Sequence, residues 1–187
     1  MGNKKLGTLI KYKNESDLVK ACLNQKRDAQ EQLYRTFADK MFAICKAYAK
    51  DRDEACEFLQ LGFIKVFNKL ENYSFKGSLE GWIRRVIVTT ALQELRKSKT
   101  YHMNIDEMHD IQEVEQNEEI QKIPFQKVVE YVNELPKKAG LILKLYAIEG
   151  FSHKEIAEEL SISVSTSKSQ LNYARKLLNL KVSDQNG

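Results

Sequence analysis

The last third of the chain constrains the fold most strongly. Residues 151–176 read as two helices joined by a tight turn, and the second helix is basic and free of acids. Ser152 and Glu155 form an S-x-x-E capping box, which predicts that the first helix begins there. Residues 161–163 predict the turn, with Ser163 as the N-cap of the second helix. This arrangement can place its second helix in the major groove of DNA.

The second of these helices has an apolar and a polar face. Leu171, Ala174, Leu177 and Leu178 recur at helical spacing and predict its buried stripe. Between residues 161 and 181 there are four cations and no acid, which favours DNA binding over an ordinary hairpin with a solvated basic face. The candidate contacts to bases and phosphates are Ser152, Thr166, Lys168, Ser169, Asn172, Tyr173, Arg175 and Lys176.

Composition predicts an all-α protein. Of the 187 residues 42% are hydrophobic, and only eight Gly and two Pro interrupt apolar runs that follow helical spacing. The net charge of +4 is too mild to imply a nucleic-acid partner by itself.

The distribution of charge predicts two binding modules and a tether. Residues 81–100 carry five cations and one acid, whereas residues 98–124 carry seven acids and two Lys. We therefore expect a flexible arm (1–14), a four-helix domain (15–97), an acidic linker (98–124), a helix-turn-helix domain (125–181) and a tail (182–187).

Apolar spacing gives the expected helices of both domains. In the first domain one helix carries the stripe Leu18, Val19, Cys22 and Leu23, and three longer helices span residues 29–48, 54–70 and 79–97. In the second domain two helices at 125–135 and 139–149, separated by Pro136, are expected beneath the helix-turn-helix.

Aromatic and cationic residues alternate between residues 73 and 85. Single-stranded nucleic acid is held in this way, because bases stack on rings while phosphates meet Arg and Lys. Polar residues further along the same helix could line a pocket for a flipped base. For Trp82, a place in the core is the alternative interpretation. The candidates are Phe75, Lys76, Ser78, Trp82, Arg84, Arg85, Thr89, Thr90, Gln93 and Arg96.

The remaining features predict a cytoplasmic protein without a cofactor or a membrane insertion. Cys22, Cys45 and Cys56 are odd in number and lack C-x-x-C spacing, so we expect reduced, buried thiols. No apolar run has the length of a membrane span, and the N-terminus lacks a signal-peptide core.

Two stretches are specific enough to identify a family. Residues 75–88 (FKGSLEGWIRRVIV) are similar to the promoter-melting and −10 segment of bacterial RNA polymerase sigma factors. Residues 145–157 (LYAIEGFSHKEIA) and 166–171 (TSKSQL) are similar to their −35 domain. From about Ser16 to Leu180 the chain resembles a sigma-70 family factor of the extracytoplasmic-function (ECF) group, in versions found in Bacteroidetes-type bacteria.

This resemblance implies partners and contact residues. The first domain would bind core RNA polymerase and the −10 element, and the second would bind the −35 element, so promoter DNA and the polymerase β′ clamp and β flap are expected partners. The acidic linker would thread toward the basic cleft of the polymerase. An anti-sigma factor could cover both DNA-binding faces. The residues expected at the clamp are Glu57, Gln60, Leu61, Phe63 and Phe67.

Four positions depart from the family's usual residues. Leu61 replaces an acid at the expected clamp contact, and Thr89 replaces the Asn associated with a flipped −10 base. Residues 164–165 replace an acidic-glycine start of the recognition helix. Tyr173 stands where Arg is common, and loss of a bidentate Arg–guanine contact removes about 1–3 kcal/mol of discrimination. These departures predict weaker autonomous promoter reading and a second protein that helps recruitment.

Two other functions are compatible with parts of the sequence. A plain helix-turn-helix regulator would bind duplex DNA, but it has no use for a single-strand platform at residues 73–82. An enzyme would need a site, and the thin candidate is a metal cluster of His102, Asp106, His109 and Asp110 in the linker. Ser152-His153 lacks an oriented acid, and capping explains Ser152.

Overall fold

The computed structural model describes residues 11–97 and 125–183, which belong to two compact units divided at residue 98. Every regular element in these two ranges is a helix, so the predicted all-α class is confirmed. The predicted linker, with its candidate metal cluster, lies outside the described residues, as do residues 1–10 and 184–187.

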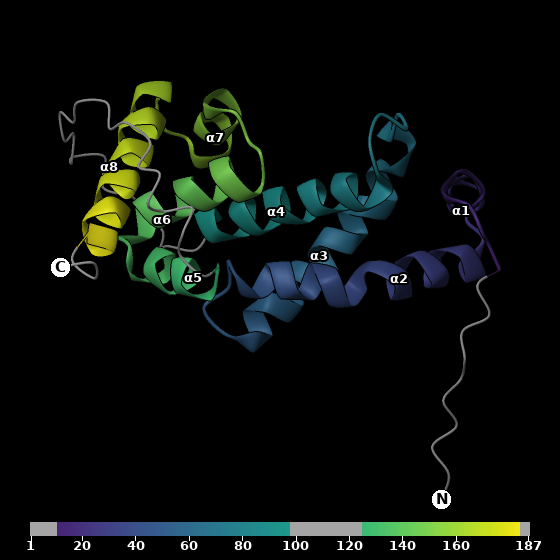
Figure 1. Cartoon of the computed structure of the whole chain (residues 1–187). Coiled ribbons are helices and arrows are strands. Elements are labelled where there is room, and N and C mark those ends of the chain that lie inside the picture. Colours follow the sequence, from purple (N-terminus) through teal and green to yellow (C-terminus); the bar gives the residue numbers. More distant parts are fainter. Residues whose placement is uncertain (1–10, 98–124, 184–187) are drawn as a thin grey trace, which may run out of the picture. The chain divides into compact units, whose positions relative to one another are not determined.

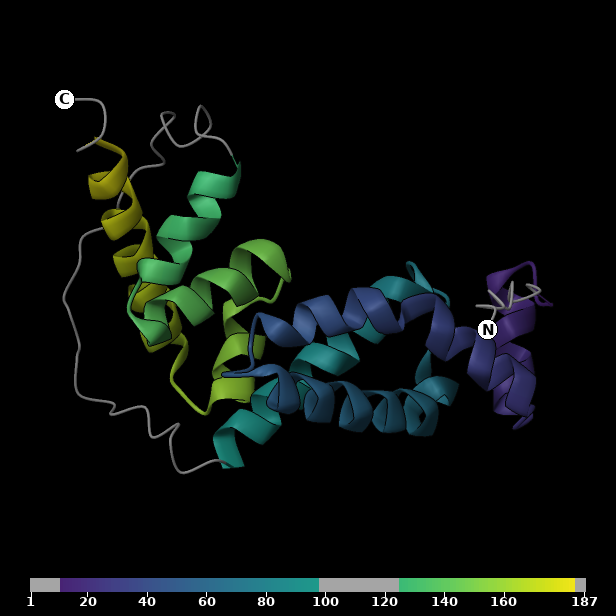
Figure 2. The same ribbon diagram turned by 90° about the horizontal axis from the view of Figure 1, so that it is seen from below.

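Residues 11–97 of the N-terminal unit form four α-helices: α1 (Glu15–Leu23), α2 (Arg27–Lys46), α3 (Arg52–Lys69) and α4 (Leu79–Lys97). A short 3₁₀ turn, η1 (Leu70–Asn72), follows α3. Figures 1 and 2 show α3 lying alongside both α2 and α4, and these pairs make the most extensive helix contacts of the unit. Leu33, Phe58, Ile83 and Ile87 are buried at their shared centre.

The first helix differs from prediction in one residue of its stripe. Leu18, Val19 and Cys22 are buried as expected, but Leu23 is 46% exposed. Leu23 is the last residue of α1, where the helix ends before it can cover that side chain.

Side-chain caps fix where helices begin. The Asn14 side chain accepts a hydrogen bond from Asp17 N at 2.7 Å and caps α1. Asp51 accepts from Glu54 N at 2.8 Å, so α3 begins at Arg52, two residues earlier than expected. The Asp51 side chain therefore serves as the N-cap of α3.

The last residues of the predicted arm are held by Gln32. The buried amide of Gln32 accepts from Lys11 N at 3.0 Å and from Tyr12 N at 3.1 Å. Its Nε2 donates to Tyr12 O at 2.8 Å. The flexible arm expected through residue 14 is therefore anchored to α2 from Lys11 onward.

The described part of the C-terminal unit contains the α-helices α5 (Phe125–Glu134), α6 (Lys137–Leu143), α7 (His153–Leu160) and α8 (Val164–Ser183). The helix expected at 139–149 is α6 followed by a π-helical turn, η4 (Lys144–Ile148). The long α8 packs against α5, α6 and α7 (Figure 1). It extends past residue 181, where the domain was expected to end, and Val182 in its last turn is buried.

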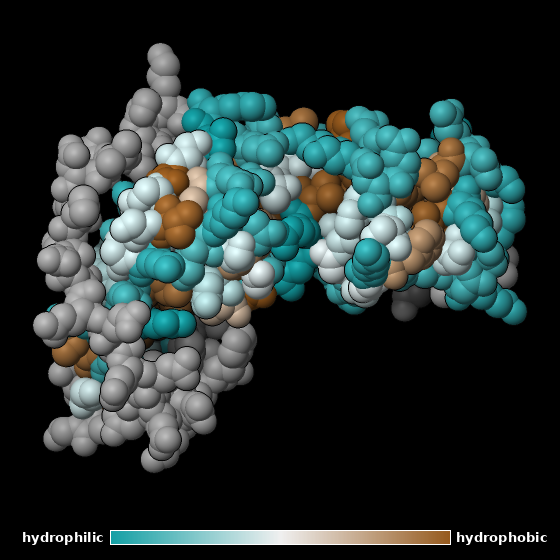
Figure 3. Space-filling model, turned by 90° about the horizontal axis from the view of Figure 1, so that it is seen from above, coloured by the Kyte–Doolittle hydropathy of each residue, from teal (hydrophilic) through white to brown (hydrophobic). Residues whose placement is uncertain are grey.

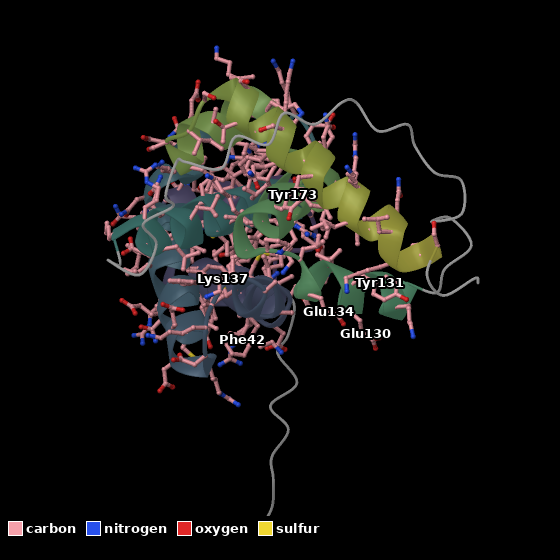
Figure 4. All side chains as sticks on the ribbon, turned by 90° about the vertical axis from the view of Figure 1, so that its left-hand side faces the viewer. Phe42, Glu130, Tyr131, Glu134, Lys137 and Tyr173 are labelled. Atoms are coloured by element: carbon pink, nitrogen blue, oxygen red, sulfur yellow. The ribbon has the colours of Figure 1, made fainter. Side chains whose placement is uncertain are left out.

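Contacts between α5 and the end of α8 close this unit. Lys181 forms an ion pair with Glu134, and its Nζ lies 5.8 Å from the centre of the Tyr131 ring. Figure 4 shows Tyr131 and Glu134 on α5, below α8, which carries Tyr173. These contacts therefore hold the end of α8 against α5.

Candidate nucleic-acid interfaces

The loop between η1 and α4 carries the aromatic residues Tyr73 and Phe75, and Trp82 follows in the first turns of α4. Tyr73 is buried, and its ring centre lies 4.8 Å from that of Phe75 and 5.7 Å from that of Trp82. Phe75 is 50% exposed, whereas Trp82 is half-buried against the core. The planes of these rings are tilted by 48° and 47° to that of Tyr73, so the three rings form a cluster of tilted rings. Both interpretations of Trp82 therefore apply, because its ring packs against the core and also belongs to this aromatic cluster.

The backbone of this loop turns sharply. Gly77 has φ +99°, a conformation that side chains disfavour. Phe75 has φ 59°, which is uncommon for a bulky residue and presents its ring outward. Ser78 then accepts from Gly81 N at 3.1 Å and caps α4. The exposed Lys76 lies within this turn, beside the rings.

One face of α4 continues from the loop. Residues three or four apart on a helix share a face. On this basis Arg84 and Thr90 lie away from it, and Thr90 is buried with its hydroxyl donating to Val86 O at 2.7 Å. The cap Ser78 and the remaining candidates on α4 share the face, by helical spacing: Trp82, Arg85, Thr89, Gln93 and Arg96.

Two polar residues of this face are already engaged within the protein. The Thr89 hydroxyl donates to Val86 O at 3.1 Å and keeps its lone pairs for an incoming donor. Gln93 Oε1 accepts from Lys65 Nζ at 2.7 Å, which leaves its amide N–H groups to donate. The face can therefore offer both acceptors and donors to a base edge.

The predicted helix-turn-helix is present in the second unit. The Ser152–Glu155 capping box is confirmed, with Ser152 N donating to Glu155 Oε2 at 2.9 Å. Ser161 ends α7 in a left-handed conformation, φ 53°. Ser163 Oγ accepts from Thr166 N at 2.9 Å, so its predicted role as the cap of α8 is confirmed.

The candidate contacts on α8 surround the helix unevenly. Ser169, Asn172 and Lys176 follow one another at spacings of three and four and occupy the middle of its outer side. Lys168 and Arg175 lie at the edge nearer α7, and Thr166 and Tyr173 at the other edge. Hydrophilic residues cover most of the face drawn in Figure 3, and its apolar areas are small.

A contact that the sequence did not predict joins α7 to α8. The His153 Nδ1 lies 2.9 Å from Oγ of Ser167, which is fully buried. The His153 ring stacks on Tyr146, with ring centres 4.6 Å apart. Arg175 lies over the same Tyr146 ring at 5.9 Å. Burial, with further contributions from Lys168 and Arg175, lowers the pKa of His153.

The expected polymerase-binding residues divide between surface and core. Glu57 and Gln60 are exposed, Leu61 and Phe67 are half-buried, and Phe63 is buried. Phe63 packs against Tyr34 at 4.7 Å and against Phe67 at 6.3 Å, measured between ring centres. Phe63 therefore belongs to the packed interior of the unit and supports α3 from there.

The outer side of α3 also carries Ile64, which the sequence analysis missed. Ile64 is 56% exposed and follows Leu61 by three residues, so the two lie on one face. The helical spacing from Gln60 was the signal that could have found it.

Comparison with protein families decides what these units are. The model of Sigma-70 region 2 matches residues 33–100, and the model of Sigma-70, region 4 matches residues 125–178. Together they cover well over half of the chain. The chain belongs to the sigma-70 family. As a family member of the ECF group it is a transcription initiation factor with DNA-binding domains, which works with core RNA polymerase and promoter DNA.

Individual relatives agree with this assignment. The chain is 27% identical over 145 residues to RNA polymerase sigma factor SigZ of Bacillus subtilis, and the match covers 78% of this chain and 82% of that protein. It is 25% identical over 153 residues to ECF RNA polymerase sigma factor SigE of Mycolicibacterium smegmatis, covering 79% of this chain and 59% of that protein.

A solved structure, CnrH in complex with the cytosolic domain of CnrY, is similar with a TM-score of 0.48 and 15% identity, over 90% of this chain and 96% of that one. A TM-score this low adds nothing to the sigma-70 assignment, which rests on the family models.

The described residues show neither a membrane span nor a metal cluster. Within 11–97 and 125–183 no helix is long and apolar enough to cross a bilayer. The same ranges contain no group of three His, Cys, Asp or Glu side chains arranged to hold a metal ion.

Proposed function

We propose that this sigma factor reads a promoter with two separate surfaces, the −10 element with the N-terminal unit and the −35 element with the C-terminal unit. The observation that carries the proposal is the exposed Phe75 ring, which packs against Tyr73 in an aromatic cluster with Trp82 beside the polar face of α4. A duplex hides its base faces, so such a platform is useful only where strands have separated.

At the −10 element, an unstacked base would lie against Phe75 and meet the polar face of α4. Thr89 would accept from the base and Gln93 would donate to it, as their remaining hydrogen-bonding groups allow. Lys76, Arg85 and Arg96 would neutralise phosphates. Thr89 offers less than the paired amide of Asn, which supports altered base preference at this position.

At the −35 element, α8 would enter the major groove with Ser169, Asn172 and Lys176 toward the bases. Asn can pair bidentately with adenine. Lys168 and Arg175, at the edge nearer α7, would contact phosphates, as would Ser152, the N-cap of α7. The positive charge and the absence of acids along α8 support this placement.

The polymerase clamp would bind the outer side of α3. Glu57 and Gln60 offer polar contacts, while Leu61 and the exposed Ile64 form a neighbouring apolar strip. Interfaces bury such strips at their centre and leave polar residues at the rim. Leu61 stands where the family usually has an acid, and Ile64 is its apolar neighbour on α3. The pair supports a more apolar clamp contact in this protein.

The experiment is a pull-down of core RNA polymerase with the purified protein, followed by transcription from a pre-melted template. We expect binding and initiation. Ile64→Ser should weaken binding to core, whereas Leu23→Ser, a matched change at an exposed apolar residue of α1, should not. Absence of core binding by folded protein that still binds duplex DNA would instead indicate a plain helix-turn-helix regulator.

The wider assignment follows from this role. A factor that serves RNA polymerase in this way works in the cytoplasm and has no catalytic activity of its own. The residues at Leu61, Thr89 and Tyr173 support help from a recruiting protein, and an anti-sigma factor is a second expected partner. The amino-acid sequence of residues 75–88 and 145–157 supports a source among Bacteroidetes-type bacteria.

A further inference from the structure

A single carboxylate on α1 holds both ends of the aromatic loop. Glu15 Oε1 accepts a hydrogen bond from the Tyr73 hydroxyl, and Glu15 Oε2 accepts one from Leu79 N at 3.1 Å. Tyr73 is where the loop leaves η1, and Leu79 is the first residue of α4. The partners are 58 and 64 residues from Glu15 in the sequence, so only the folded unit brings them together.

Glu15 lies at the starts of two helices. It is the first residue of α1, and its carboxylate accepts a hydrogen bond from the first N–H of α4. The first N–H groups of a helix have no acceptor within the helix, so Glu15 supplies one from outside.

The Tyr73 ring is fixed by its hydroxyl as well as by its neighbours. Besides Glu15, Gly77 O lies 2.8 Å from that hydroxyl oxygen, so the hydroxyl end is held from both sides of the loop. Burial and then the Glu15 carboxylate raise the pKa of Tyr73 to about 12, so the hydroxyl remains a donor at neutral pH. A fixed Tyr73 in turn fixes the rings of Phe75 and Trp82, which lie against it.

We propose that Glu15 is the positioning residue for this loop, holding the aromatic cluster of Phe75, Tyr73 and Trp82 preformed for an unstacked base. The inference rests on the proposed function of the loop in binding single-stranded DNA. A preformed cluster loses less conformational entropy when a base binds, and so binds more tightly than a loop that must be ordered first. Glu15 itself need not touch the DNA.

Two substitutions separate hydrogen bonding from charge. Glu15→Ala removes both contacts. Glu15→Gln also removes the charge, but its Oε1 can accept from Leu79 N while its Nε2 donates to the Tyr73 oxygen, whose own hydrogen then turns to Gly77 O. Glu71→Gln is the control, because Glu71 is an exposed acid next to the loop and loses the same charge.

Trp82 gives a direct readout of the aromatic cluster, since it is the only tryptophan of the chain. We expect acrylamide to quench Trp82 more strongly in full-length Glu15→Ala than in the wild type. Fluorescence anisotropy with short single-stranded DNA of random sequence should show binding weakened about three- to tenfold by Glu15→Ala. Glu15→Gln and Glu71→Gln should stay close to the wild type in both measurements, with all proteins folded by circular dichroism.

The proposal is overturned if Glu15→Ala leaves either Trp82 quenching or single-strand binding unchanged, or if Glu15→Gln is as impaired as Glu15→Ala. Its failure differs from failure of the proposed function. If the wild type initiates transcription with core polymerase but Glu15→Ala leaves Trp82 quenching unchanged, only the role of Glu15 is refuted. If the wild type does not initiate transcription but Glu15→Ala still increases Trp82 quenching, the proposed function is refuted, whereas the role of Glu15 in holding the loop is not.

Discussion

His153 and Ser167 join the two helices of the helix-turn-helix, with Nδ1 of His153 2.9 Å from Oγ of Ser167. The first consequence concerns pH. Burial and nearby cations lower the pKa of His153 in the folded protein below its ordinary value of 6.5. The unfolded chain therefore binds more protons as the pH falls below that value, and the folded unit loses stability until the folded-state pKa is passed.

We expect His153→Asn to reduce this pH dependence. The measurement is thermal unfolding, followed by circular dichroism, near neutral pH and near pH 5 in the wild type and the variant. On acidification, the Tm of the wild type should fall by more than the Tm of His153→Asn. Equal losses in the two proteins would show that another group is responsible.

Gly62 of α3 allows close approach to α4. A Cβ built on Gly62 would lie 2.3 Å from Ile87 Cδ1, and Ile87 is fully buried. Gly62→Ala should therefore destabilise the N-terminal unit by about 1–3 kcal/mol, the usual cost of overpacking. Denaturant unfolding measures the change. Adding Ile87→Val, which removes the clashing methyl, should recover part of the loss; costs that simply add in the double variant would contradict the clash.

Thiol chemistry should distinguish the folded from the unfolded chain. Burial raises the pKa of Cys22 to about 11 and that of Cys45 to about 12, and the thiolate is the reactive form. Both should resist a thiol reagent near neutral pH and react once guanidinium chloride unfolds the protein. Mass spectrometry of labelled peptides would assign each site. Rapid labelling of either cysteine in the folded protein would contradict its burial.

Two residues of α8 should affect DNA binding in different ways. Lys168→Ala should weaken binding to all duplexes and lower the slope of log affinity against log salt concentration by about 0.9, as loss of one phosphate contact requires. Asn172→Ala should change the preferred sequence, at a cost of about 1–3 kcal/mol for the favoured base. Anisotropy titrations over a set of duplexes and salt concentrations measure both effects. The assignment fails if Asn172→Ala weakens every duplex equally.

Much of the fold follows from local patterns in the sequence. Apolar spacing and caps predicted α4 at its observed bounds, Leu79–Lys97, and the Ser152 capping box predicted the start of α7. Local rules performed less well at helix ends. The cap at Asp51 starts α3 two residues before the expected residue 54, and α8 continues past its expected end at residue 181, where Val182 is buried.

The contacts that organise the candidate site lie beyond local patterns. His153 meets a serine 14 residues away, and Glu15 meets Tyr73 across 58 residues. Neither pair belongs to a repeating spacing, so only packing of whole helices could reveal them. Burial of Phe63 and Thr90, both candidate contact residues, likewise depends on which helix faces meet, and spacing alone does not determine it.

The most direct test of the central claim is to map transcript starts on duplex genomic DNA with core RNA polymerase, with and without the purified factor. We predict new starts that share two upstream elements at a constant separation. Phe75→Ala should impair use of the element nearer the start, and Asn172→Ala should alter the base preference of the farther one. Starts that share no common elements, or none that depend on the factor, would contradict promoter reading by these two surfaces.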